Sequence, residues 1–276
     1  MGEWTLSSFS AALDRVDLFP VAPYVPDFRH FRRWAFESAA LDLALRQAGL
    51  SLAAALGRDA RPVTFVMSPG PEDSAAPTLA RLASYPRLRF KLMPTPGWDT
   101  AVVDELAATG AVDVVDLKGQ YDERVPVALA ADAALYERIL TAFPTAWIED
   151  PALSPATEPL LRGHLHRVTW DAPIGSAADI AKRGEELRMV NMKPSRFGTL
   201  ATLFASYEHC ERTGIGMYGG GQFELGPGRT QVQRLASLFH PDAPNDVAPA
   251  AYNEPILRPG LPSSPLPAPP DVAGFR

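Results

Sequence analysis

Three carboxylates stand at the ends of apolar segments that lie far apart along the chain. Asp116, Glu149 and Asp171 each close a short run of apolar or β-branched residues. If these runs are successive parallel strands, about 4.8 Å apart, the three carboxylates meet at one edge and can share an ion. An oxygen-only set suits Mg2+, with Mn2+ as the alternative, although a strand-end Asp is also a common helix cap or turn former. The pattern predicts a divalent-metal site.

Three lysines accompany these acids. Lys91 and Lys193 lie in or directly after apolar runs, and Lys118 follows Asp116 by two residues. An ammonium group in apolar surroundings is costly, so Lys193 is expected to pair with carboxylates or to have a lowered pKa, and either suits a general base. The alternative is a lysine that extends toward solvent and only neutralises the acids.

A glycine-rich segment offers further backbone N–H groups. Gly219-Gly220-Gly221 precedes Glu224. Such a run can cradle a phosphate, but close packing or turn geometry explains it equally well. Gly220, Gly221 and Glu224 are therefore candidate substrate-binding residues.

The elements that must position these residues repeat along the chain, because each apolar run is followed by a helical stretch. The eight runs are Val63–Met67, Leu88–Met93, Val112–Leu117, Ala146–Glu149, Val168–Asp171, Met189–Lys193, Gly216–Gly219 and Asp246–Ala248. Amphipathic helices are expected over Ala75–Ser84, Thr100–Thr109, Ala128–Phe143, Ser176–Gly184, Thr199–Arg212 and Thr230–Phe239. Eight such units predict a closed (β/α)8 TIM-like barrel, whose strand ends share one mouth. A doubly wound open sheet is disfavoured because Ser68-Pro69-Gly70-Pro71 is not a G-x-G-x-x-G turn.

The barrel is predicted to occupy residues 31–253 and to begin with a helix, Phe31–Leu50, that stops at Gly49. Residues 1–30 are read as an irregular N-terminal segment. The prolines gather in the C-terminal part, so residues 254–276 are expected to form an extended tail that packs on the surface.

Composition narrows the class of protein. A chain of 276 residues with 46% hydrophobic and 21% charged residues can bury one large core. Its net charge of -6 provides no basic surface for nucleic acid or an anionic membrane, and it has no apolar run of about 18 residues that could span a bilayer. The single Cys210 excludes an intrachain disulfide. We expect a cytoplasmic protein with a small-molecule partner.

Several segments together resemble the enolase superfamily, and most closely its muconate-lactonizing branch, which includes o-succinylbenzoate synthases and N-acylamino acid racemases. The segments are WAFESAALDLALRQAGLSL from Trp34, RFKLMPTPGWD, VDVVDLKGQY, WIEDP, TWDAPI, NMKPSRFG and the glycine-rich stretch before Glu224. Their order and their spacing both agree with the family.

The resemblance implies a role for each candidate residue. Asp116, Glu149 and Asp171 would be the metal ligands, Lys193 the acid or base on one face of the substrate, and Lys91 the first lysine of the family's Lys-x-Lys strand. Such enzymes use a divalent ion to hold a substrate carboxylate while a lysine removes the α-proton.

The chain departs from the family at several positions. Met93 stands where the second lysine of Lys-x-Lys is expected, and a thioether cannot carry a proton. Lys118 replaces an Asn, and Ala172 replaces a Glu. We hypothesise that Lys118, beside the second strand's end, substitutes for the missing lysine. Only about sixty residues precede the first strand, so residues 1–30 would be a remnant of the N-terminal capping domain, leaving the barrel mouth largely uncovered and self-association plausible.

Three functions follow in order of preference. The first is a metal-dependent lyase or dehydratase, racemase or cycloisomerase, similar to o-succinylbenzoate synthase; a single base would favour elimination over racemisation. The second is a catalytically degenerate barrel that binds metal or a carboxylate ligand without turnover. The third is an unrelated phosphate-binding barrel that uses the glycine-rich segment.

Overall fold

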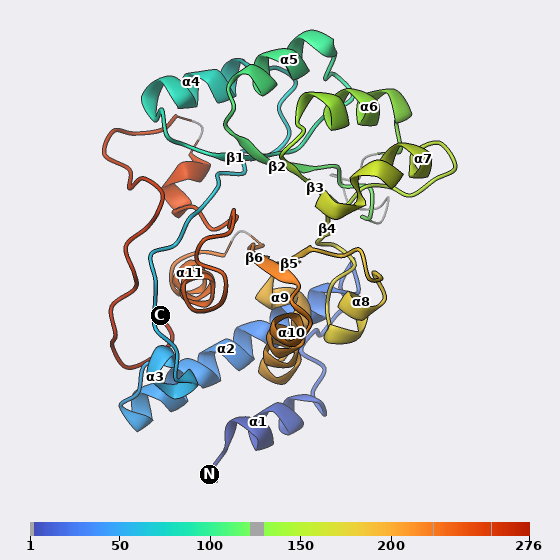
Figure 1. The fold of residues 1–276 in the computed structure, drawn as a ribbon. Helices are drawn as coiled ribbons and strands as arrows, with labels where there is room; N and C mark the ends of the chain where they lie inside the picture. Colours follow the sequence, from blue (N-terminus) through green and yellow to red (C-terminus); the bar gives the residue numbers. More distant parts are fainter. Residues whose placement is uncertain (1–2, 122–129, 223, 255) are drawn as a thin grey trace.

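A parallel sheet forms the centre of the molecule, and each strand pairs with the next one along the chain (Figure 1). The computed structural model describes residues 3–121, 130–222, 224–254 and 256–276. Within them, the strands of this sheet are β1 (Phe90–Leu92), β2 (Val112–Asp116), β3 (Trp147–Glu149), β4 (Val168–Trp170), β5 (Met189–Met192) and β6 (Gly216–Gly219). Val114, Val115 and Ile148 are fully buried, because these strands are covered on both faces.

Two further segments close the sheet into a ring. Met67 forms a parallel bridge with the first residue of β1, and Phe65 bridges Asn245. On the other side, the backbone N–H of Asp246 donates to the last carbonyl oxygen of β6 at 2.7 Å. The predicted (β/α)8 arrangement of a TIM-like barrel is therefore confirmed.

The first and last of the predicted strands are less regular than expected. Val63–Met67 makes only isolated bridges, and Asp246–Ala248 is not a strand. Pro244 and Pro249 flank the last segment, and proline cannot donate a ladder hydrogen bond. The barrel is thus closed at this point by single hydrogen bonds rather than by a continuous ladder.

Helices surround the sheet and follow each strand in turn. They are α4 (Ala76–Ser84), α5 (Thr100–Ala108), α6 (Ala133–Ala142), α7 (Glu158–Leu161), α8 (Ala177–Ala181), α9 (Pro194–Phe197), α10 (Leu200–Thr213) and α11 (Pro227–Phe239), with the 3-10 helices η1 (Arg162–Arg167) and η2 (Ala250–Asn253). Asp99, Asp132 and Thr199 begin α5, α6 and α10 by accepting a hydrogen bond from a backbone N–H of the first turn. Figure 1 shows α4, α5 and α6 on one side of the ring and α10 and α11 on the other.

Two helices are shorter than predicted. The segment Ser176–Gly184 is helical only over α8, and Gly184 adopts a left-handed φ of 88°. The helix expected from Ala128 begins at Ala133, since Asp132 provides its cap; residues 128 and 129 lie outside the described residues.

The N-terminal part is helical and packs against the barrel. It contains α1 (Leu6–Leu13), α2 (Phe28–Ala48) and α3 (Leu52–Leu56). Trp34, Leu41 and Leu45 of α2 are buried, and the helix ends at Gly49, with φ 66°, as predicted. Because α2 begins at Phe28, the boundary that we placed after residue 30 falls inside this helix.

The C-terminal tail is extended, and two of its residues join it to the N-terminal half. Leu266 forms an antiparallel bridge with Val63, and Gly274 bridges Ser51. Phe275 is fully buried with its ring edge-on to that of Trp34. The end of the tail is therefore part of the core.

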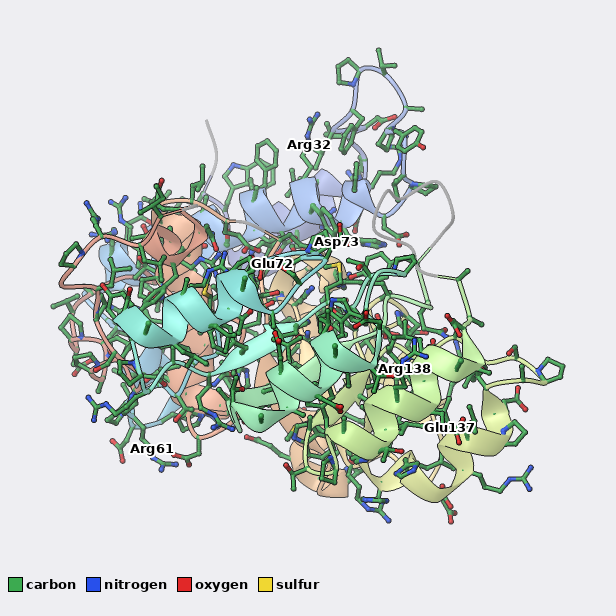
Figure 2. The ribbon with its side chains drawn as sticks, turned by 90° about the horizontal axis from the view of Figure 1, so that it is seen from above. Arg32, Arg61, Glu72, Asp73, Glu137 and Arg138 are labelled. Carbon is green, nitrogen blue, oxygen red and sulfur yellow. The ribbon has the colours of Figure 1, made fainter. Side chains whose placement is uncertain are left out.

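Charged side chains such as Arg32 on α2 and Glu137 on α6 lie on the outside of the molecule (Figure 2). Within the described residues, no helix combines the length and apolar character needed to cross a bilayer.

Candidate active site

The three carboxylates singled out from the sequence converge in the barrel. Asp116 ends β2, Glu149 ends β3 directly beside it, and Asp171 follows β4. One oxygen from each lies within 4.8 Å of the others, and all three side chains are buried. They meet because neighbouring parallel strands bring their carboxyl ends to the same mouth.

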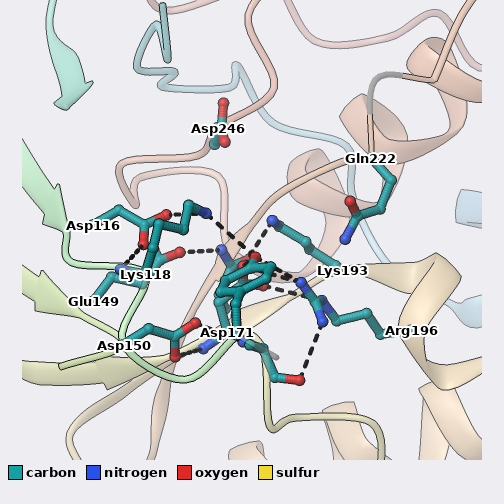
Figure 3. A network of polar contacts seen from close by, with 12 residues as sticks. Asp116, Lys118, Glu149, Asp150, Asp171, Lys193, Arg196, Gln222 and Asp246 are labelled. Carbon is teal, nitrogen blue, oxygen red and sulfur yellow. Dashed lines mark hydrogen bonds and ion pairs between the residues drawn. The ribbon is translucent and has the colours of Figure 1, made fainter. Parts of the chain in front are cut away.

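The three lysines contact this carboxylate cluster, and Lys118 and Lys193 are labelled in Figure 3. Lys91 Nζ lies 3.0 Å from Asp116 Oδ2 and also donates to Glu149. Lys118 Nζ lies 2.5 Å from the same Asp116 oxygen, and Lys193 Nζ lies 2.8 Å from Asp171 Oδ2. Each lysine is thus paired with carboxylates, as expected for an ammonium group in the barrel interior.

The lysines differ in their electrostatic balance. Burial lowers the pKa of Lys193, and the attraction of Asp171 offsets this only in part. For Lys91, burial acts in the same direction, but Asp116 and Glu149 outweigh it and raise the pKa well above its usual value. Among these two, Lys193 is the one whose surroundings favour release of a proton.

The carboxylates respond to the same charges. Burial, together with the charge of Asp116, raises the pKa of Glu149 to about 8. Burial also favours the protonated form of Asp116, but Lys118 and Lys91 outweigh it and lower the pKa of that carboxyl. Glu149 and Asp116 therefore differ in their tendency to hold a proton, although they lie side by side.

Tyr121 and Arg196 belong to the site, although we did not single them out. Tyr121 Oη donates to Asp171 Oδ2 at 2.8 Å, and an Arg196 Nη donates to Tyr121 Oη at 2.8 Å. Arg196 Nε lies 3.3 Å from Asp171 Oδ1. The only signal in the sequence is spacing, since each follows a candidate lysine, Lys118 or Lys193, by three residues.

Two further side chains hold the acidic residues in place. Tyr218 on β6 donates to Glu149 Oε2 from across the barrel. Asp150 accepts hydrogen bonds from the backbone N–H groups of Asp171 and Ala172, both at 2.8 Å. Asp150 is therefore a positioning residue for Asp171.

The glycine-rich segment packs against Lys193. A Cβ atom at Gly220 would lie 2.7 Å from Lys193 Cε and 2.8 Å from Asn191 Oδ1. Glu224 turns back onto its own loop, where its Oε2 accepts from the N–H of Gln222 at 2.8 Å. Close packing therefore explains Gly220, and no phosphate cradle is needed to account for it.

A cavity of about 450 Å³ lies beside the cluster. Its walls include the three lysines, Met93, Ala172, Arg196 and Gly221, and from the N-terminal part Tyr24, Phe28 and Phe31. The start of α2 and the residues before it thus cover part of the mouth.

The carboxylate cluster fits a hard divalent ion. Its donors are all oxygens, which Mg2+ and similar cations prefer. Asp116 Oδ2 and Asp171 Oδ1 are buried and make ion pairs, but neither accepts a hydrogen bond of good geometry. Buried oxygens in that state are suited to a metal ion.

The family assignment rests on two matched segments. Residues 59–254 match the family described as "Domain of unknown function (DUF8230) C-terminal domain", and residues 1–55 match its N-terminal domain.

Two curated relatives are enzymes. The o-succinylbenzoate synthase of Bacillus subtilis (strain 168) is 28% identical over 247 residues, which is 82% of this chain and 62% of the relative. The N-succinylamino acid racemase of Amycolatopsis sp is 30% identical over 252 residues, or 86% of this chain and 66% of the relative. The chain thus spans less than two thirds of either relative.

Solved structures share the fold at lower identity. Muconate lactonizing enzyme from Pseudomonas putida has 18% identity and a TM-score of 0.65, covering 98% of this chain and 75% of that one. A dipeptide epimerase from Methylococcus capsulatus, complexed with Mg ion, has 22% identity and a TM-score of 0.58, covering 78% and 64%. The chain therefore belongs to the DUF8230 family, and it shares its fold with solved structures of the enolase superfamily.

Proposed function

We propose that this chain is a divalent-metal-dependent enzyme that removes the α-proton of a small carboxylate substrate. The observation that carries the proposal is the convergence of Asp116, Glu149 and Asp171 beside a cavity whose wall includes Lys193. Oxygen donors and a lysine of lowered pKa are the two components that such a reaction requires.

Asp116, Glu149 and Asp171 would hold Mg2+, with Mn2+ as the alternative. The dipeptide epimerase of similar fold, whose structure contains Mg, supports this choice. When bound, the ion would supply positive charge that stabilises the enediolate formed from the substrate carboxylate. Tyr218 and Asp150 would keep the carboxylate oxygens oriented toward it.

Lys193 would act as the base. Lys193 lines the cavity, and Asp171 Oδ2 lies 2.8 Å from its Nζ and orients it. Lys91 would remain an ammonium group, because its carboxylate partners stabilise the charged form. It would bind and neutralise charge rather than carry a proton.

The reaction class follows from the number of proton carriers. Met93 lines the cavity and stands where the second lysine of the enolase-superfamily Lys-x-Lys strand is expected. Lys118, our candidate substitute, is a poorer proton carrier, because Asp116 and Asp171 outweigh burial and raise its pKa. Lys193 would therefore act without an equal partner. One base is sufficient for β-elimination, whereas racemisation normally uses one on each face. We therefore favour a lyase similar to o-succinylbenzoate synthase over a racemase or cycloisomerase.

The test is exchange of the substrate α-proton. The chain should exchange the α-proton of N-succinylamino acids, dipeptides or related carboxylates in deuterated buffer containing Mg2+, as followed by NMR. Lys193→Gln should lower the rate by about 100-fold or more, because the base is removed while the charge cluster keeps its acids. The exposed Lys182→Gln serves as the control, since it removes the same charge from the surface.

The same experiment identifies the alternative. The second candidate function is binding of a metal ion or a carboxylate without turnover. It is favoured by Met93, which cannot carry a proton. Binding of Mg2+ with no exchange across the panel would support that candidate. Exchange that persists unchanged in Lys193→Gln would contradict the assignment of the base.

A further inference from the structure

Lys118 has an unusual backbone conformation. Its φ is 51°, in the left-handed region, where among the described residues only one other non-glycine residue, Asp150, has a positive φ. Long side chains seldom adopt this conformation, which Asn and Gly tolerate better. Such residues persist where the surroundings hold them in place, and they cluster at functional sites.

Both ends of Lys118 contact the same carboxylate. Its backbone N–H donates to Asp116 Oδ1 at 3.2 Å, and its Nζ lies 2.5 Å from Asp116 Oδ2. The side chain is almost fully buried, with 6% of the residue exposed. Lys118 therefore closes a ring over Asp116, and its ammonium group lies against an oxygen that a metal ion would use.

Positively charged side chains already surround the carboxylate cluster. Lys91, Lys118, Lys193 and Arg196 all pair with Asp116, Glu149 or Asp171, so four cations face three carboxylates. A divalent ion that entered this arrangement would meet repulsion from several buried cations. The affinity of the cluster for a metal ion must then depend on whether these cationic side chains can move away from the carboxylates.

Lys118 has a second partner besides Asp116. Its Nζ lies 3.3 Å from Tyr121 Oη and 4.6 Å from the centre of the Tyr121 ring, and Lys118 is part of the cavity wall. Tyr121 can hold an ammonium group by hydrogen bonding and by the ring face. Lys91, by contrast, is held between two carboxylates.

We propose that Lys118 is a built-in counter-cation of the carboxylate cluster, which a divalent ion must displace from Asp116 in order to bind. The inference rests on the proposed metal-dependent function and adds that metal binding and the position of Lys118 exclude one another.

The test measures metal affinity in variants of the full chain. Lys118→Asn removes the ammonium group and suits the left-handed backbone, and Lys118→Met removes the charge but keeps an unbranched side chain. Both should bind Mn2+ at least about tenfold more tightly than the natural chain in calorimetric or EPR titrations. Lys118→Arg, which keeps the charge, and Lys182→Asn, which removes an exposed one, should stay within about twofold of it.

Thermal melting provides a readout independent of activity. Addition of Mn2+ should raise the melting temperature of Lys118→Asn more than that of the natural chain, because tighter binding to the folded state stabilises it further. Equal or weaker Mn2+ binding by both Lys118→Asn and Lys118→Met would overturn the inference.

A separate variant distinguishes failure of the inference from failure of the proposed function. If Asp116→Asn abolishes Mn2+ binding while the two neutral variants leave it unchanged, the metal site stands and the role of Lys118 is wrong. If the natural chain, Lys118→Asn and Lys118→Met all fail to bind Mn2+, both proposals are overturned.

Discussion

At the scale of single residues, the surroundings rather than the residue type separate the roles of the lysines. Lys91 and Lys193 are both buried at the barrel mouth. Burial lowers the pKa of Lys193, whereas two carboxylates outweigh burial and raise the pKa of Lys91. For Lys193, burial and the repulsion of neighbouring cations outweigh the attraction of Asp171. The proton acceptor is therefore set by the balance of burial and nearby charges of both signs.

Gly220 should be required for the position of Lys193. A Cβ atom there would overlap Lys193 Cε and Asn191 Oδ1, and Lys193 is held by its pairing with Asp171. Gly220→Ala should lower the rate of α-proton exchange by about 100-fold, because a displacement of roughly 1 Å costs that much at a reacting group. Gly163→Ala, at a position with open space, is the matched control in the same exchange assay. Equal rates for the two variants would argue against a positioning role for Gly220.

At the scale of elements, the strand ends are joined to one another by side chains as well as by the backbone ladder. Asp150, just after β3, binds the two backbone N–H groups that follow β4. This contact fixes the direction in which Asp171 leaves its strand. The register of β2 and β3 places Asp116 beside Glu149 and so fixes the positions of these two acids.

Replacement of Asp150 should destabilise the protein strongly. Asp150→Ala leaves two buried N–H groups without acceptors, and we expect a loss of about 3 kcal/mol in the free energy of unfolding. Asp150→Asn keeps one acceptor oxygen and should lose less. Urea denaturation of both variants provides the measurement. A larger loss for Asn than for Ala would show that these hydrogen bonds do not dominate.

At the scale of the whole molecule, the two ends of the chain are packed together. Phe275 lies fully buried against Trp34 of α2, and Gly274 bridges Ser51. The proline-rich tail therefore holds α2 against the barrel.

Removal of the Phe275 ring should lower the stability of the entire fold. Phe275→Ala is expected to cost about 3 to 5 kcal/mol, the usual range for a buried Phe. Val272→Ala, at a half-exposed position of the same tail, should cost less than about 0.5 kcal/mol. Chemical denaturation measures the free energy of unfolding of both variants. A loss in Phe275→Ala as small as that in Val272→Ala would mean that the end of the tail contributes little to stability.

His240 should contribute a loss of stability in mild acid, opposite in sign to the contribution of Glu149, whose raised pKa favours the folded state as the pH falls. Burial lowers the pKa of His240 to about 4, although Asn245 pairs with its ring. The unfolded chain, with a pKa near 6.5, then binds a proton before the folded chain does, so stability is complete above about pH 6.5 and declines toward pH 4. Between pH 7.5 and 5, this residue should account for about 2 kcal/mol.

The contribution of His240 can be isolated by substitution. Lowering the pH from 7.5 to 5 should change the stability of His240→Gln by about 2 kcal/mol more favourably than that of the natural chain, because the variant lacks this contribution. The exposed His166→Gln should keep the original pH dependence. An unchanged pH dependence in His240→Gln would assign the effect to other groups.

The sequence alone was sufficient for the barrel and for its acidic mouth. Apolar runs alternating with helical stretches determine the order of the elements, and strand ends bring Asp116, Glu149 and Asp171 together in any such barrel. The role of Gly49 at the end of α2 was readable for the same reason, since it depends only on neighbouring residues.

Only the tertiary structure decided which partners these groups have. Tyr121 and Arg196 reach Asp171, Tyr218 reaches Glu149 across the barrel, and Lys118 turns back onto Asp116. The periodicity of apolar residues in the sequence reports contacts between residues near one another in the chain. Contacts across a closed barrel depend on the distance between its strands and on the direction of each side chain. The charge balance of the site, and therefore its affinity for an ion, is set by that second kind of contact.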